Sequence, residues 1–414
     1  MRRYFILLLL MITLSASAQQ PDTVFLKNLL ESHPELFSHV LNHPTHNEVQ
    51  ILYTQINRDK NNVPHFTSYS YRLNANHYFY PASTVKLPTA IFALEKLNEL
   101  HIPGLTKRTV MKTDSSFAGE TKKLVDSTSS NNLPSIKNYI KKILLVSDNY
   151  AYNRLYEFVG RAEINSKLKK YNLNNTRIIG RLAIYDGGEC AKHTNAIDFY
   201  KGNQLIYHQD TQYDPKEYPM HLENMLQGKG YLDRDDKLIM KPYDFSEKNV
   251  YTIADQQMVL KRLLFPETFP KNQQFDLKPA DYKFIYRYMS MFPNESKIPA
   301  YNSPDYFPAF CKYLFYGDDS TAVINPHIRI FNKIGDSYGY VIDNAYIVDF
   351  KNKVEFILTA VVQSNDDGIY NDNKYEYKTV CQPFMKNLGQ VIYQYELQRQ
   401  KEYLPDLSKF KFSY

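Results

Sequence analysis

Strand-like alternation at both ends of the chain, separated by a largely helical middle, is the sequence feature that most restricts the fold. Residues 48–56 and 66–73 alternate apolar and polar side chains, and turn residues separate the two segments. Three further strands are predicted near the other end, at residues 328–334, 344–350 and 354–362. Strands from distant parts of a chain can pair in one sheet. The pattern therefore predicts an α+β fold, an α/β sandwich in which helices flank one antiparallel sheet beside an all-helical lobe.

Helices are predicted where apolar residues recur at helical spacing. The clearest pattern covers residues 84–99, and Ser83 stands at its entrance as an N-cap residue would. The other predicted helices cover residues 136–146, 151–159, 252–265 and 375–400. Lys141 and residues 167–170 are interpreted as parts of solvated helix faces.

The order of these elements suggests how the chain is divided. We predict an N-terminal helical segment at residues 19–44, an α/β lobe formed by residues 45–115 and 326–414, and a helical lobe at residues 116–325. Within the helical lobe, residues 186–250 and 266–325 show no clear period, and we expect them to be mostly loops.

The first residues have the pattern of an export signal. Arg2 and Arg3 precede an apolar run over residues 5–14, and the small residues at 16–18 form a typical cleavage site. The apolar run is shorter than the roughly 20 residues that a membrane-spanning helix requires. We therefore expect a signal peptide at residues 1–18, a periplasmic or secreted protein, and no stable membrane anchor after cleavage. An uncleaved N-terminal anchor is the alternative.

Charge and composition exclude several classes of protein. Lysine and arginine number 50 against 44 acidic residues, and they are scattered, so no nucleic-acid partner is expected. The 14 glycines in 414 residues are about half the usual share, and no nucleotide-binding glycine motif occurs. Three cysteines, at 190, 311 and 381, allow at most one internal disulfide, and their pairing is left open.

A histidine cluster near the N-terminus is the one metal-like feature that the residues offer. His39, His43 and His46 lie close together, but Pro44 interrupts a continuing helix and no carboxylate or thiol is interleaved. We interpret these histidines as solvated, and we expect neither a metal nor a cofactor.

The first element with chemical meaning is Ser83-Thr84-Val85-Lys86. A serine at a helix start and a lysine three residues later share one face, so the amine can approach the hydroxyl. A buried, neutral lysine could take the serine proton and activate the oxygen as a nucleophile. The same spacing at residues 166–169 and 408–411 lies in charged contexts and is interpreted as surface.

The second element, Ser147-Asp148-Asn149, interrupts two apolar helices. It could simply be a turn that caps the second helix. The functional interpretation places the Ser147 hydroxyl and the Asn149 amide in a cleft, where they relay a proton and hold a substrate amide.

The third element, Lys333-Ile334-Gly335, ends a predicted strand, and the pattern K-x-G occurs once in the chain. The lysine adds positive charge for an anionic substrate. We expect Gly335 to stand in the following turn, where it lets a substrate backbone lie close to the strand edge. The simpler interpretation is a hairpin turn with a surface lysine.

The order and placement of these three elements resemble those of the penicillin-recognising serine hydrolases, and most closely the class A β-lactamase-like group, with S-x-x-K, S-D-N and K-T-G. The resemblance covers roughly residues 45–200 and 250–400 and includes the strand sequences NAYIVDF and VEFILTAVV. The resemblance implies the β-lactamase-like fold, an antiparallel sheet flanked by helices beside a helical lobe. It also implies that residues 200–250 and 266–325 are insertions around the cleft.

The resemblance also implies roles for individual residues. Ser83 would be the acylated nucleophile, and Lys86 its base or proton relay. Ser147 would pass a proton to the leaving nitrogen, while Asn149 would orient the substrate amide. Lys333 would support Ser147 and the substrate carboxylate.

The implied oxyanion hole combines the backbone N–H of Ser83 with one just after Gly335, near Asp336 or Ser337.

Three departures from the family pattern bear on the chemistry. No basic residue occurs in the strand at residues 344–350, so an expected partner for the substrate carboxylate is missing, and Arg329 is poorly placed to replace it. Ile334 replaces a hydroxyl that is expected to bind the substrate carboxylate, and Ser337 or Tyr338 could compensate. The glutamate that deacylates class A enzymes is also missing, because residues 176–192 contain no E-x-x-L-N string. Glu189 and Asp186 are the carboxylates available there, and we expect Glu189 to take this role.

The resemblance therefore leaves three functions open. The first is hydrolysis of β-lactams through an acyl-enzyme on Ser83. The second is a D-alanyl-D-alanine peptidase or a penicillin-binding protein that deacylates slowly, which the missing glutamate favours. The third is a non-catalytic envelope protein that uses the fold for binding. The expected partner is a small β-lactam or a cell-wall peptide, and the protein is expected to be a monomer.

Overall fold

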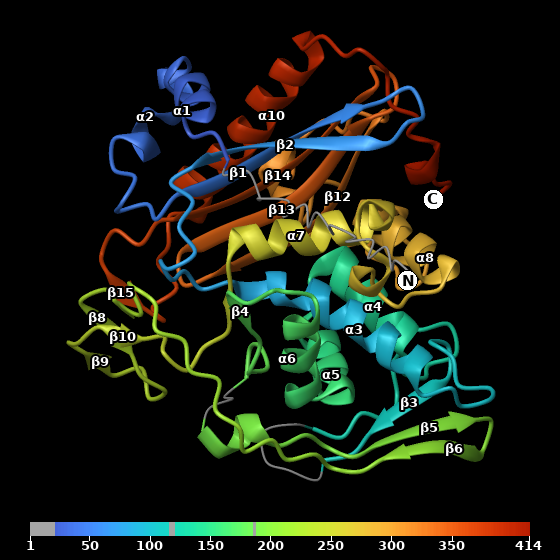
Figure 1. Cartoon of the computed structure of the whole chain (residues 1–414). Coiled ribbons are helices and arrows are strands. Elements are labelled where there is room, and N and C mark those ends of the chain that lie inside the picture. Colours follow the sequence, from blue (N-terminus) through green and yellow to red (C-terminus); the bar gives the residue numbers. More distant parts are fainter. Residues whose placement is uncertain (1–20, 116–120, 185–187) are drawn as a thin grey trace, which may run out of the picture.

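The computed structural model describes residues 21–115, 121–184 and 188–414 (Figure 1). The expected signal peptide at residues 1–18 lies outside these ranges, as does Asp186. Among the described helices, none has both the length and the apolar character that crossing a membrane requires.

One five-stranded antiparallel sheet joins the two ends of the chain, as the alternation predicts (Figure 1). The N-terminal hairpin consists of β1 (Gln50–Arg58) and β2 (Pro64–Tyr71). The C-terminal strands are β12 (Ile328–Ser337), β13 (Tyr340–Asp349) and β14 (Val354–Gln363). The spatial order is β12-β13-β14-β1-β2, so β14 pairs with β1 and the two ends close one sheet. The α+β class is confirmed.

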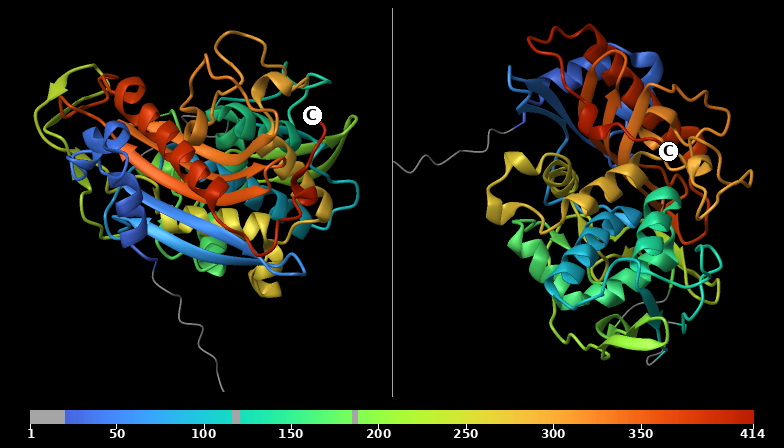
Figure 2. Two further views of the ribbon diagram at one scale, coloured as in Figure 1. Left: turned by 90° about the horizontal axis from the view of Figure 1, so that it is seen from above. Right: turned by 90° about the vertical axis from the view of Figure 1, so that its right-hand side faces the viewer.

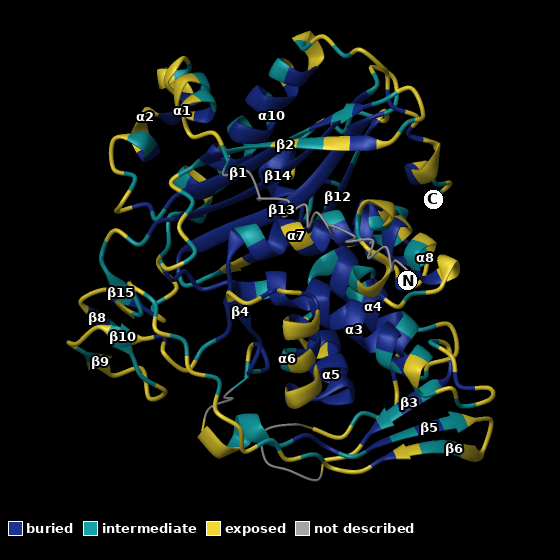
Figure 3. Ribbon diagram, viewed as in Figure 1, coloured by how far each residue is buried: buried dark blue, intermediate teal, exposed yellow. Residues whose placement is uncertain are grey.

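The first C-terminal hairpin is tighter than we expected. Gly335 lies within β12, paired with Ile342, and is not part of the turn. The turn consists of Tyr338 and Gly339, both with positive φ. Every residue of β13 and β14 is buried (Figure 3), so polar alternation does not mark where these strands begin.

Helices cover both faces of the sheet (Figure 2). On one face lie α10 (Gln382–Gln398), α1 (Val24–Glu31) and α2 (Pro34–Leu41), and Ile330 and Ile334 share their apolar core. On the other face lies α7 (Ile253–Leu264), whose core includes Phe331. Even-numbered positions of β12 therefore face α10, and odd-numbered positions face the helical lobe.

The helical lobe contains α3 (Lys86–Glu99), α4 (Ile136–Val146), α5 (Asn149–Val159) and α6 (Arg161–Lys170). Helix α3 is almost fully buried against α4 and α5. Although we placed its residues with the α/β lobe, its packing partners are those of the helical lobe.

The segments expected to be loops contain more structure than their sequence suggests. In the first, β5 (Ile197–Lys201) and β6 (Gln204–Gln209) form a small sheet with β3 (Val110–Thr113). The remaining short strands are β4 (Thr176–Arg177), β7 (Leu226–Gln227), β8 (Gly230–Leu232), β9 (Leu238–Ile239), β10 (Tyr243–Asp244), β11 (Val250–Tyr251) and β15 (Ile369–Tyr370). In the second, α8 (Pro279–Ser290) packs on β12, and the short segment α9 (Tyr313–Tyr316), whose two central residues are not helical, contacts α10.

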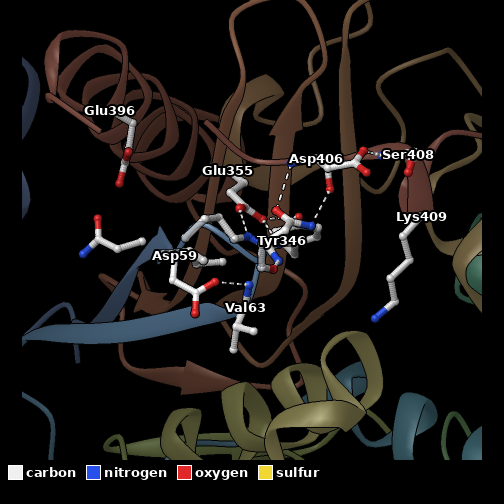
Figure 4. Close-up of polar contacts among 12 residues, drawn as sticks. Asp59, Val63, Tyr346, Glu355, Glu396, Asp406, Ser408 and Lys409 are labelled. Atoms are coloured by element: carbon white, nitrogen blue, oxygen red, sulfur yellow. Dashed lines mark hydrogen bonds and ion pairs between the residues drawn. The ribbon is translucent and has the colours of Figure 1, made fainter. Parts of the chain in front are cut away.

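A buried ion pair between Arg58 of β1 and Glu355 of β14 stabilises the end of the sheet opposite β8, β9 and β15 (Figure 4). The Arg58 guanidinium donates hydrogen bonds of 2.6 and 2.8 Å to the two carboxylate oxygens of Glu355, and the Tyr346 hydroxyl donates one of 2.6 Å. The last segment of the chain is fastened beside it, where the Asp406 N–H donates to the Asn62 amide oxygen at 3.0 Å.

Candidate active site

Ser83 lies in a single 3₁₀ turn, Ala82–Val85, that leads into α3. Ala82 has φ of 46°, a left-handed conformation that non-glycine residues rarely adopt and that often occurs at functional sites. The expectation that Ser83 caps the helix is wrong, since its side chain makes no capping hydrogen bond. Its Oγ accepts a hydrogen bond from Lys86 instead, so the oxygen is held by an amine and not by the backbone.

The Lys86 amino group lies at the centre of the site. Its Nζ is 2.8 Å from Ser83 Oγ, 2.6 Å from Asn149 Oδ1 and 3.2 Å from Ser147 Oγ. The side chain is fully buried, and desolvation, together with the positive charge of Lys333, holds the pKa of Lys86 well below its usual value of 10.5. A buried amine with a lowered pKa can exist in the neutral form that accepts a proton.

Ser147 and Asn149 enter the site because the chain breaks between two helices. Helix α4 ends with Ser147 in the left-handed conformation, φ 58°. Asp148 then caps α5, its carboxylate accepting from the Ala151 N–H at 2.7 Å. The S-D-N motif is thus both a helix cap, through Asp148, and a source of polar groups beside Lys86.

Lys333, on β12, approaches Ser147 from the sheet. Its Nζ donates to Ser147 Oγ at 2.8 Å and to the Ile334 carbonyl at 2.8 Å. Burial lowers the pKa of Lys333 to about 8. Since its side chain is buried, the simpler interpretation of a surface lysine in a turn is wrong.

Gly335 brings β12 into contact with the turn that carries Ser83. A Cβ atom at position 335 would lie 2.9 Å from the Ser83 backbone nitrogen and 2.9 Å from the Pro81 carbonyl oxygen. The missing side chain therefore allows strand and turn to touch, which differs from the role we expected for this glycine.

Ser83 opens into a cavity of about 400 Å³. Ser337 and Asn149 line it, as the sequence led us to expect, and the far wall is formed by residues 180–184 and 247–249. Tyr80 and Arg181 also line the cavity. No local pattern identifies them, because they belong to no motif and their contacts come from distant segments.

Glu189 does not line this cavity. It stands on an exposed turn, where Lys192 donates to its carboxylate at 3.1 Å and lowers the pKa of Glu189. The Tyr213 hydroxyl also donates to Glu189, at 3.3 Å, and neither partner lines the cavity. Our expectation that Glu189 activates water is therefore corrected: the local cation and phenol hold its carboxylate away from Ser83.

Two other carboxylates border the cavity in the part of the chain that the structure describes. Asp336 follows Gly335, but its side chain lies on the α10 face of β12, where Tyr313 donates to it at 2.8 Å. Glu247 is exposed at the rim.

Ser83 and the buried Lys86 lie between a sheet and a helical lobe, and a comparison with protein families agrees with this arrangement. The model of the beta-lactamase enzyme family matches residues 42–395, and the chain belongs to this family. The match confirms the resemblance carried by the three motifs.

Solved structures similar to this chain include PBP-A, which is 16% identical with a TM-score of 0.48, covering 91% of this chain and 99% of that one. The beta-lactamase from Desulfarculus baarsii DSM 2075 is 13% identical with a TM-score of 0.46, covering 90% and 99% of the two chains. The beta-lactamase from Sphaerobacter thermophilus DSM 20745 is 11% identical with a TM-score of 0.46, covering 87% and 95%. A comparison with curated proteins finds no match.

Proposed function

We propose that this protein is a serine hydrolase that forms an acyl-enzyme at Ser83 with a β-lactam or a related cell-wall peptide amide. The observation that carries the proposal is the 2.8 Å contact between Lys86 Nζ and Ser83 Oγ, made by an amine whose pKa burial lowers.

The proposed acylation begins when Ser83 Oγ attacks the carbonyl carbon of the substrate and its proton passes to neutral Lys86. The backbone N–H groups of Ser83 and Asp336 would stabilise the oxyanion, since Gly335 holds the two segments together. The carbon–nitrogen bond then breaks. Ser147 Oγ, which lies within hydrogen-bond distance of both lysines, delivers a proton to the leaving nitrogen and regains one from Lys86.

The fate of the adduct separates a β-lactamase from a slowly deacylating penicillin-binding protein or D-alanyl-D-alanine peptidase. Within the described residues, Glu247 is the cavity-lining carboxylate that could still reach a water, since Asp336 faces the other side of β12. A carboxylate at an exposed rim is a poor general base for an acyl group at a half-buried serine. This favours a persistent adduct.

The test is covalent labelling with a fluorescent penicillin, followed by mass spectrometry over time. Wild type should gain one acyl group, and Ser83→Ala should gain none. Ser166→Ala and Ser408→Ala are matched controls, because each carries the same S-x-x-K spacing elsewhere in the chain. An adduct that lasts for hours supports the penicillin-binding function. Rapid turnover of nitrocefin that Glu247→Gln converts into a stable adduct supports a β-lactamase with Glu247 as base. No labelling of wild type supports the non-catalytic alternative.

We further propose that the protein is exported to the periplasm or the medium, since Arg2, Arg3 and the apolar run precede small residues at 16–18. The mass of the protein from its native host tests this: cleavage after Ala18 is expected, and an intact N-terminus in the soluble cell fraction would contradict export.

A further inference from the structure

A segment that the family resemblance marks as an insertion contacts Tyr338, which lines the active-site cavity. Residues 224–245, here called the inserted segment, carry β7 to β10 and pair through β8 with β15 beside the central sheet. They lie next to β15 at one end of the sheet (Figure 1).

Gln227 fastens the inserted segment to the sheet. Its side chain is buried, and its Oε1 accepts hydrogen bonds from the hydroxyls of Tyr340 at 2.9 Å and Tyr370 at 2.7 Å. Its Nε2 donates to the Asn224 carbonyl at 2.8 Å. Each polar atom of the amide is therefore engaged, and a buried polar group satisfied in this way fixes one arrangement.

The inserted segment supports one aromatic ring in particular, that of Tyr338 in the β12–β13 turn. The ring centroid of Tyr338 lies 5.5 Å from that of Tyr243 and 5.2 Å from that of Phe245. The ring also meets Tyr80 edge-on, at 4.9 Å and 89°, and Tyr80 in turn contacts Phe245 at 6.0 Å. Tyr338 has φ of 55°, a conformation that is unfavourable for a bulky residue unless its surroundings hold it there.

Tyr80 and Tyr338 line the same cavity as Ser83, whereas Ser147 and Lys333 do not. In the proposed reaction Ser147 protonates the leaving nitrogen, so the leaving group lies on the Ser147 side. In a β-lactam the opened ring stays attached to the acyl group on that side. The acyl side chain, which lies on the other side of the reacting carbonyl carbon, therefore extends into the cavity beside the two tyrosines.

We propose that Tyr80 and Tyr338, held by the inserted segment, form an aromatic wall that selects acyl groups bearing a flat aromatic ring. The inference rests on the proposed function and names its substrate preference. Rings that are already fixed lose little conformational entropy on binding, and edge-to-face contact adds to the burial of apolar area. The inserted segment therefore acts as a specificity element, with Gln227 as a positioning residue.

The experiment compares two penicillins that share the bicyclic nucleus and differ in the acyl group, phenylacetyl in one and acetyl in the other. The second-order rate constant for acylation of Ser83 is measured by mass spectrometry for each. Wild type should favour the phenylacetyl compound about tenfold. Tyr338→Leu should bring the ratio close to one, and Tyr338→Phe should keep it, since the ring remains.

Gln227→Ala tests the role of the inserted segment. A general loss of structure would lower both rates together, so a fall in the ratio reports the position of Tyr338. Tyr403→Leu, at an exposed tyrosine of the C-terminal segment, should change neither rate.

Different results reject the two proposals. Equal rates for the two compounds in wild type, or a ratio that Tyr338→Leu leaves unchanged, overturn the aromatic wall while acyl-enzyme formation stands. No adduct with either compound overturns the proposed function and this inference with it.

Discussion

A Cβ atom placed on Gly335 would lie 2.9 Å from the backbone nitrogen of Ser83, closer than real Cβ contacts allow. The position of Ser83 therefore depends on a glycine in the edge strand β12, which lies about 250 residues further along the chain. Gly335→Ala must push β12 away from the 3₁₀ turn, and a displacement of this kind can reduce catalysis about 100-fold. The acylation rate of Ser83 by a penicillin measures the loss.

A matched control uses the opposite face of the same strand. Ile334→Val removes one methylene from the core under α10, should cost about 1 kcal/mol of unfolding free energy and should leave acylation unchanged. A Gly335→Ala variant that acylates at the wild-type rate would contradict the argument.

The two lysines predict a bell-shaped dependence of acylation on pH. Lys86 must be neutral to accept the Ser83 proton, so the rate rises with pH through the lowered pKa of Lys86. Lys333 attracts an anionic substrate only when it is charged, so the rate falls as pH rises through its pKa of about 8. Acylation by a penicillin between pH 5 and 10 checks both limbs.

The assignment of the descending limb has its own test. Lys333→Ala should lower the rate and remove the fall near pH 8. A Lys333→Ala variant that still loses activity there would show that another group titrates.

The sequence predicted the elements whose signal is local. The helix over residues 84–99 and the S-x-x-K spacing need only neighbouring residues, and both are present in the structure. A single sheet shared by strands from both ends of the chain was also expected, because alternating strands at both ends have few other ways to cover their apolar faces. The structure shows which strands join the two ends, since β1 pairs with β14.

Local sequence patterns do not predict contacts between distant segments. Lys141 and Lys167 were interpreted as solvated, but Lys141 donates to the Ile298 carbonyl and Lys167 lies 2.7 Å from Glu99. No local pattern identifies the partners that bring Gly335 close to Ser83 or those that hold the Tyr338 ring in place.

The ion pair of Arg58 and Glu355 predicts a large loss of stability when one partner is removed. Both side chains are buried, so Glu355→Ala leaves a guanidinium without its countercharge and should cost about 3–5 kcal/mol of unfolding free energy. Urea unfolding measures this cost.

Replacing both partners of this pair is the informative control. Arg58→Leu combined with Glu355→Leu should recover most of the stability, because no charge then remains buried without a partner. The pair does not line the cavity, so a correctly folded double variant should be acylated at the wild-type rate. A double variant as unstable as Glu355→Ala would contradict this account.

His77 predicts that the inserted segment is held more firmly at low pH. The imidazole contacts the Glu48 carboxylate, and Asn224 Nδ2 donates to the same carboxylate at 3.1 Å. Glu223 lies on the other side of the ring, 4.0 Å from Nδ1, while Arg72 is the nearby opposing charge. The hydrogen bond to Glu48 raises the pKa of His77 above its usual 6.5.

Because this pKa is higher in the folded than in the unfolded protein, the stabilisation is fully present below about pH 6.5 and is lost as pH rises through the folded value. His77→Gln should therefore lower the melting temperature at pH 5.5 by more than at pH 8.5. His65→Gln, at an exposed histidine of β2, is the control and should show a much smaller difference. An equal effect of His77→Gln at both pH values would mean that the charge on the ring does not hold the inserted segment.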